Sequence, residues 1–94
     1  MKRKSTAQEL AKITGVSSAR AMEAIIKAQL TSAVLKAIQK NKITHQELAK
    51  RSGLTRSAVT GILSGSLQKV TIDRVLRLVE AVGLVAEVKL KKAA

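Results

Sequence analysis

Three polar side chains have types and spacing suited to reading the edges of nucleic-acid bases. Arg56, Ser57 and Thr60 fall on the outward face of one predicted helix. An Arg guanidinium can bond a guanine through two parallel hydrogen bonds, and Ser and Thr hydroxyls can reach bases or phosphates. Ala58 and Gly61 offer no side-chain hydrogen bond, although Ala58 can meet a thymine methyl group. The pattern therefore predicts base contacts from a single helix, with a narrow and partly indirect sequence preference.

Residues 44–65, THQELAKRSGLTRSAVTGILSG, must position these side chains. Thr44 forms a capping box with the glutamate three residues later and so starts a short helix. Gly53 can take the left-handed conformation that ends this helix in a sharp turn. Thr55 is a good cap for a second helix over about 56–64. This is a helix-turn-helix pattern, in which the second helix lies in the DNA major groove.

The starts of the two short helices are candidate phosphate contacts. Thr44 and Thr55 cap helix N-termini, whose backbone N–H groups favour phosphate oxygens. His45 is the chain's one histidine, and it can donate to a phosphate, more strongly when protonated. Lys50 and Arg51 on the first motif helix either contact the DNA backbone or lie on a solvent-exposed face of the helix. Their residue types do not distinguish these two interpretations.

Composition favours a nucleic-acid partner over other classes. The 94-residue chain has 18 basic and 6 acidic residues, and its formal net charge of +12 indicates a polyanion partner. Aromatic residues are absent, so modules that stack bases on aromatic rings are not expected. A single histidine, no cysteine and scattered carboxylates provide no nucleophile–base set and no metal-ligand spacing. We expect no enzyme activity, no metal and no cofactor.

The chain has no long apolar run and no signal-peptide pattern. We therefore expect a cytoplasmic protein with no membrane contact. The absence of cysteine also fits a reducing compartment.

Apolar periodicity predicts helices on both sides of the motif. Residues 1–18 are expected to form a basic arm with a short helix at about 7–14. Residues 19–83 are expected to form the DNA-binding domain, which begins with a long helix over about 19–40 and a possible break near Gln29. The predicted buried stripe of this long helix is Met22, Ile25, Ile26, Leu30, Val34, Leu35 and Ile38. A last helix is capped by Thr71, and its predicted buried stripe is Ile72, Val75, Leu76, Val79 and Val82.

The C-terminal segment, residues 84–94, changes to an alternating pattern. Its predicted apolar face consists of Leu84, Ala86, Val88 and Leu90. Such alternation predicts a β-strand. A lone strand leaves backbone groups unpaired, so its simplest partner is the same strand of a second copy across a two-fold axis. A frayed, exposed tail is the alternative. The predicted fold class is all-α with a C-terminal strand for homodimerisation.

The sequence QELAK occurs twice, at residues 8–12 and 46–50. The second copy lies inside the motif. The first copy lacks a supporting helix before it. The helix that follows it, over about 19–40, is needed as the core helix of the unit that contains the second copy. We interpret the first copy as an appended helix-turn, with a second DNA-reading unit as the alternative.

The motif resembles the lambda-repressor-like (XRE) helix-turn-helix family, and residues of about 26–90 resemble its HigA-type antitoxin group. The resemblance rests on KAQLTSAVLKAIQ before the motif, the motif itself, and GSLQKVTIDRVLRLVEAVGLVAEVKL after it. It implies a lambda-repressor-like bundle and a dimeric transcriptional repressor that binds operator DNA through the second motif helix. By analogy with family loop positions, it also implies a phosphate contact by Lys69. His45 stands where the family usually carries Gln, so the usual contact at that position stays open.

Two other functions remain as alternatives. Members of the resembled group often neutralise a small toxin ribonuclease, so toxin binding through residues 1–25 can be the main role and DNA binding secondary. The charge alone is also consistent with a nucleoid protein that coats DNA without sequence preference.

Overall fold

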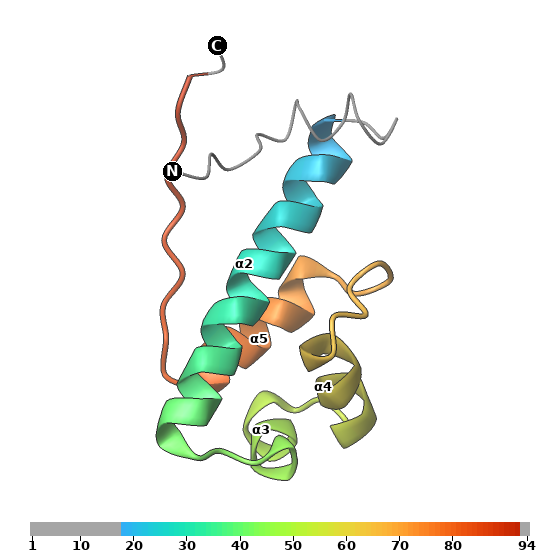
Figure 1. Cartoon of the computed structure of the whole chain (residues 1–94), viewed down its shortest axis with the longest axis vertical. Helices are drawn as coiled ribbons and strands as arrows, with labels where there is room; N and C mark the ends of the chain where they lie inside the picture. Colours follow the sequence, from blue (N-terminus) through green and yellow to red (C-terminus); the bar gives the residue numbers. More distant parts are fainter. Residues whose placement is uncertain (1–17, 93–94) are drawn as a thin grey trace.

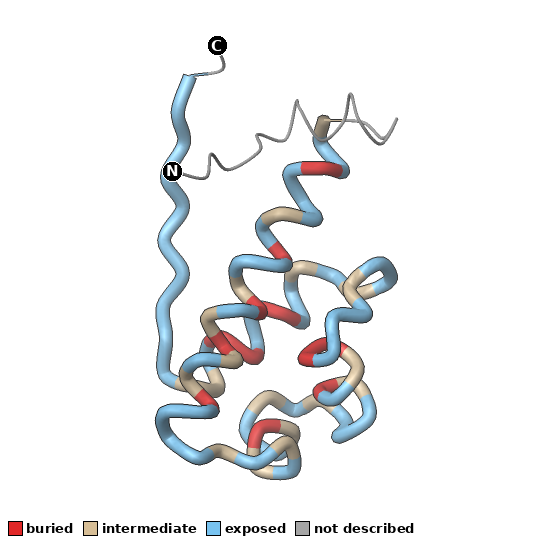
Figure 2. Tube along the Cα trace, viewed as in Figure 1, coloured by how far each residue is buried: buried red, intermediate tan, exposed pale blue. Residues whose placement is uncertain are grey.

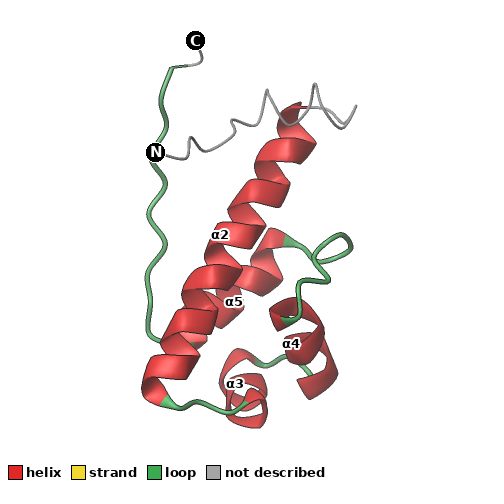
Figure 3. Ribbon diagram, in the orientation of Figure 1, coloured by secondary structure: helices red, strands yellow, loops and turns green. Residues whose placement is uncertain are grey.

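The computed structural model describes residues 18–92. Within this range the chain forms four helices, α2 (Ser18–Asn41), α3 (His45–Ser52), α4 (Arg56–Leu63) and α5 (Ile72–Ala81), arranged as in Figure 1. The described range contains no β-strand (Figure 3). None of these helices is long and apolar enough to cross a membrane. The basic arm, the helix expected at about 7–14 and the first QELAK copy lie outside the described residues.

The long helix α2 confirms the predicted helix over 19–40 and runs through Gln29 without a break. Its C-terminal half joins the core through Val34 and Ile38, which are 0% and 8% exposed. The prediction was wrong for Met22 and Ile26, which are exposed. The N-terminal half of α2 extends beyond α5 in Figure 1, and in this half Ala21 and Lys27 are the buried positions instead.

The core lies where the four helices meet, and buried positions gather on their facing sides in Figure 2. Helix α2 packs against α5, and α3 packs against both α4 and α5. The buried cluster consists of Val34, Ile38, Leu48, Val59, Ile62, Leu63, Val75, Leu78 and Val79. Because the chain has no aromatic residue, aliphatic side chains alone fill this core.

The buried stripe of α5 differs from the predicted one at Leu76 and Leu78, and Ile72 and Val82 are half-buried. Val75 and Val79 are buried as predicted, but Leu76 is exposed and Leu78 is fully buried. Leu78 lies one turn from Val75 and therefore on the same side of the helix. Leu76 is the next residue after Val75 and points about 100° away around the helix axis. Both sides carry leucine, so only the packing of α5 in the bundle selects between them.

The C-terminal segment does not form the predicted strand in the single chain. Residues 84–92 are exposed and run as an extended segment beside α2 in Figure 1. Its first amide bonds back to the helix, with 3.1 Å between the Leu84 nitrogen and the Val79 carbonyl oxygen. Val88 and Leu90 are 85% and 92% exposed. A strand needs a neighbouring strand for its backbone groups, and the described part of this chain supplies none.

Candidate nucleic-acid interface

The predicted capping chemistry builds the first helix of the motif. The Thr44 hydroxyl accepts a hydrogen bond from the Glu47 amide at 3.1 Å, with the extended backbone of an N-cap. At the other end, Gly53 has φ 76° and ψ 8°, and its amide donates to the Ala49 carbonyl. This left-handed glycine turns the chain, so that α4 begins three residues later.

Helix α4 separates a buried face from an exposed polar face. Thr55 is its N-cap and accepts from the Ala58 amide at 3.1 Å. The buried face consists of Val59, Ile62 and Leu63. The outward face consists of Arg56, Ser57 and Thr60, which are all exposed. The predicted base-reading residues are therefore brought together on one surface, and the burial of the opposite face keeps that surface pointing outward.

Charge on this surface is not neutralised within the described residues. The three ion pairs among the described residues lie on α2, α3 and α5, and they join Glu23 to Lys27, Glu47 to Arg51 and Asp73 to Arg77. Arg56 is in none of these pairs, so its guanidinium is available to a ligand. Thr44 and Thr55 accept backbone hydrogen bonds through their oxygens, which leaves each hydroxyl proton free to be donated.

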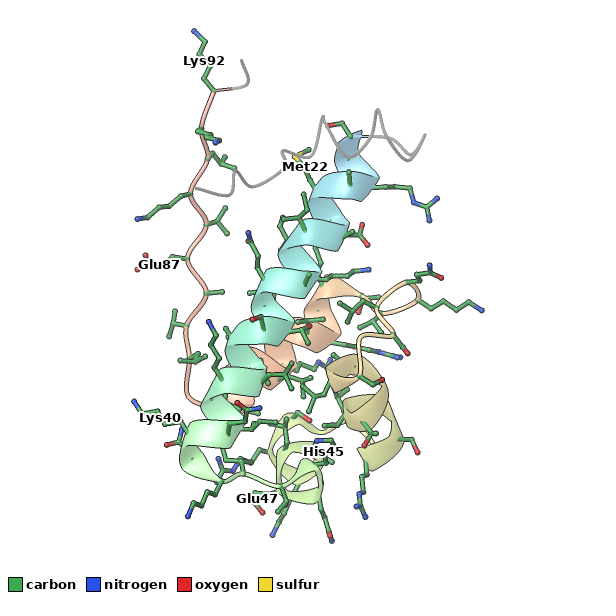
Figure 4. All side chains as sticks on the ribbon, in the orientation of Figure 1. Met22, Lys40, His45, Glu47, Glu87 and Lys92 are labelled. Atoms are coloured by element: carbon green, nitrogen blue, oxygen red, sulfur yellow. The ribbon has the colours of Figure 1, made fainter. Side chains whose placement is uncertain are left out.

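His45 connects the two motif helices. It is the first residue of α3 and is partly buried, and its Nδ1 lies 3.0 Å from the Thr60 hydroxyl oxygen on α4. Figure 4 labels His45 where α3 and α4 approach each other. The sequence predicts His45 and Thr60 as separate site residues, but it does not predict the contact between them.

The comparisons with known proteins agree with this geometry. A family described as a helix-turn-helix domain matches residues 14–91. The chain belongs to this family. The match covers the described bundle and most of the segment after it. No curated protein and no solved structure matches the chain.

Lys69 lies in the loop that follows α4 in the helix-turn-helix domain, and it is exposed. Lys27, which no sequence motif singles out, joins this loop to α2. The Lys27 ammonium donates to the Leu67 carbonyl at 3.2 Å and pairs with Glu23 at 2.7 Å, although Lys27 is only 4% exposed. The hydrogen bond from Lys27, and then its charge, lower the pKa of the Glu23 carboxyl. The spacing of Glu23 and Lys27 on a helix predicts their pairing, but no local pattern predicts the loop contact 40 residues away.

The two open positions on α3 differ in their contacts. Arg51 pairs with Glu47 at 3.1 Å and also reaches the Ala81 carbonyl at 3.5 Å, so it links α3 to the end of α5. Lys50 is exposed and has no ion pair with a described residue. These contacts give Arg51 a structural role and leave Lys50 free to approach a ligand.

No group of histidine, cysteine and carboxylate side chains in the described range can hold a metal ion. The helix-turn-helix domain is typical of regulators that are not enzymes. Its exposed polar face can recognise a ligand through hydrogen bonds and charge.

Proposed function

We propose that this chain is a sequence-specific regulator of transcription that binds double-stranded DNA through α4 in the major groove. The observation that carries the proposal is the outward face of α4, where Arg56, Ser57 and Thr60 are exposed on a helix whose opposite face is fixed in the core. A guanidinium and two hydroxyls offer the hydrogen bonds that major-groove readout needs. The net charge of +12 supplies the attraction to phosphates.

The phosphate contacts in this proposal flank α4. Thr44 and Thr55 present the N-termini of α3 and α4, and His45 lies beside the first of them. Lys69 reaches a phosphate from the loop after α4. We assign residues 19–83 to the DNA-binding domain.

We further propose that the regulator is a homodimeric repressor whose two copies pair through residues 84–94. Support comes from the exposed extended segment that follows α5, where apolar residues alternate and backbone groups lack strand partners. The predicted dimer face is Leu84, Ala86, Val88 and Leu90. Two-fold pairing would place two α4 helices on the two halves of a symmetric operator. Such a regulator would act on DNA in the cytoplasm.

The test is selection of bound sequences from random duplex DNA at about 150 mM salt, where charge alone contributes less. We expect an enriched palindrome with half-sites about one helical turn apart. Arg56→Ala should lose about 1–3 kcal/mol of discrimination at one base pair per half-site. Arg74→Ala is the matched control, because Arg74 is exposed on α5 and has no ion pair with a described residue. Strong binding with no enriched motif would contradict the proposal and favour a protein that coats DNA.

A second function, neutralisation of a small toxin protein with repression of the shared operon, has one structural observation in its favour. Met22, which is 46% exposed on α2, lies within the segment 1–25 expected to contact a toxin, and Ile26, which is 43% exposed, directly follows that segment. A neighbouring gene for a small basic ribonuclease-like protein would favour this role. Failure of Met22→Lys to weaken binding to that protein would argue against it.

A further inference from the structure

The hydrogen bond between His45 and Thr60 has a direction that affects what α4 offers to a base. Nδ1 of His45 and Oγ1 of Thr60 are 3.0 Å apart and belong to different helices. A threonine hydroxyl has one proton to donate and two lone pairs. A neutral imidazole has one nitrogen that donates and one that accepts. The bond can therefore run either way, depending on which imidazole nitrogen carries the proton.

A phosphate contact would set this direction. His45 is the first residue of α3, at the helix N-terminus proposed to face a phosphate, and its Nε2 has no hydrogen-bond partner among the described residues. A neutral imidazole that donates its Nε2–H to a phosphate must leave Nδ1 as an acceptor. The Thr60 proton is then donated to Nδ1. Thr60 keeps only its lone pairs for a base in the groove.

We propose that His45 is a positioning residue that makes Thr60 a hydrogen-bond acceptor toward the base it faces. In the major groove, the donors that an acceptor can bind are the amino groups of adenine and cytosine. A free threonine hydroxyl can donate or accept a hydrogen bond, whereas the His45–Thr60 pair leaves Thr60 only as an acceptor and so favours bases with an amino group. This inference rests on the proposed reading of DNA by α4, and it adds the base class read at one position and the residue that enforces it.

The local surroundings leave the hydroxyl accessible for this role. Thr60 is exposed, although His45 is partly buried. Glu47, two residues after His45 on α3, is already paired with Arg51, and Arg56 lies one turn before Thr60 on α4. Arg56 has no ion pair among the described residues and can bind the neighbouring base.

The experiment measures base preference, position by position, for the full chain and its variants on random duplex DNA. It is run at about pH 8, the upper end of the range in which histidine side chains titrate. Thr60→Val removes the hydroxyl and keeps the shape of the side chain. His45→Gln keeps an N–H donor for the phosphate and removes the Nδ1 acceptor. Thr31→Val is the matched control, because Thr31 is buried in α2 away from the proposed interface.

We expect the full chain to prefer adenine or cytosine over guanine or thymine on the strand that Thr60 faces, by about threefold to tenfold, the ratio given by one neutral hydrogen bond. Thr60→Val and His45→Gln should each bring that ratio close to one and leave the other positions unchanged. The double variant should lose no more preference than Thr60→Val alone, because the two residues act as one unit. Thr31→Val should retain the wild-type preference.

Other outcomes would overturn the inference. If His45→Gln lowers affinity equally for all sequences, His45 only binds a phosphate. If Thr60→Val alone changes the preference, the hydroxyl is read without help from His45. A motif that depends on Arg56 but not on Thr60 would refute this inference and keep the proposed function. A wild-type chain with no preferred sequence would refute both.

Discussion

The same substitution, Gly→Ala, is expected to change stability in opposite directions at two positions of the motif. Gly53 ends α3 with φ 76°, in the left-handed region. Gly61 lies inside α4 and has no positive φ. A Cβ added at either position would meet no atom within 4 Å. Steric contact is therefore the same in both variants, and only the backbone conformation differs.

The magnitudes follow from that difference. An L-residue in the left-handed region costs about 1–2 kcal/mol. Alanine also lowers the conformational entropy of the unfolded chain, and this offsets about 0.4–1 kcal/mol of that cost. Gly53→Ala should therefore destabilise the fold by about 0.5–1.5 kcal/mol. Gly61→Ala should stabilise it by about 0.5–1 kcal/mol, because alanine is the better helix former.

The assay is thermal unfolding followed by far-ultraviolet circular dichroism. A change of 1 kcal/mol moves Tm by about 4–8 °C in a domain of this size. All variants need the same chain concentration, because dimerisation would make Tm depend on it. Gly53→Asn is the matched control and should lose less stability than Gly53→Ala, since asparagine tolerates the left-handed conformation. Equal shifts of the same sign in both alanine variants would refute the reasoning.

Gly61→Ala also separates stability from DNA binding. Gly61 follows Thr60 on α4 and leaves the helix surface bare, so that α4 can approach the floor of the groove closely in the proposed complex. The methyl group of Gly61→Ala should therefore weaken DNA binding while it stabilises the fold. Unchanged or tighter binding by this more stable variant would show that Gly61 does not lie close to the DNA.

Three further predictions concern other parts of the fold. Thr31→Val should leave the protein as stable or stabilise it by about 1 kcal/mol, because the buried Thr31 hydroxyl oxygen has no hydrogen-bond partner among the described residues. Urea unfolding measures this, and a clear loss of stability would contradict it. Lys27 lowers the pKa of Glu23 below its ordinary 4.5, so the stability from this pair is present above about pH 4.5 and is lost as the pH falls through the lowered pKa. Glu23→Gln should therefore lose less stability on acidification than the wild type, and equal losses would contradict this. Val88→Asp should dissociate the proposed dimer in sedimentation equilibrium, whereas Val85→Asp, on the other face of the segment, should not; equal effects would argue against an alternating strand interface.

The sequence predicted the features that depend on neighbours in the chain. The caps of α3 and α4, the left-handed Gly53 and the four helices between residues 18 and 83 follow from spacings of three or four residues. The exposed face of α4 follows from the same periodicity, because a helix that buries Val59 and Ile62 must expose Thr60. For this reason the sequence predicted which face of α4 is exposed.

Features that join distant segments came only from the tertiary structure. The burial of Lys27 depends on a carbonyl 40 residues away, and the choice of Leu78 over Leu76 depends on where α5 lies in the bundle. Which side of α2 is buried near its start, Ala21 rather than Met22, also depends on packing. The contact of His45 with Thr60 requires two helices to cross at a given angle. Hydrogen-bonding propensity and apolar periodicity act along a few residues and determine the helices, whereas packing in three dimensions decides which side chains meet.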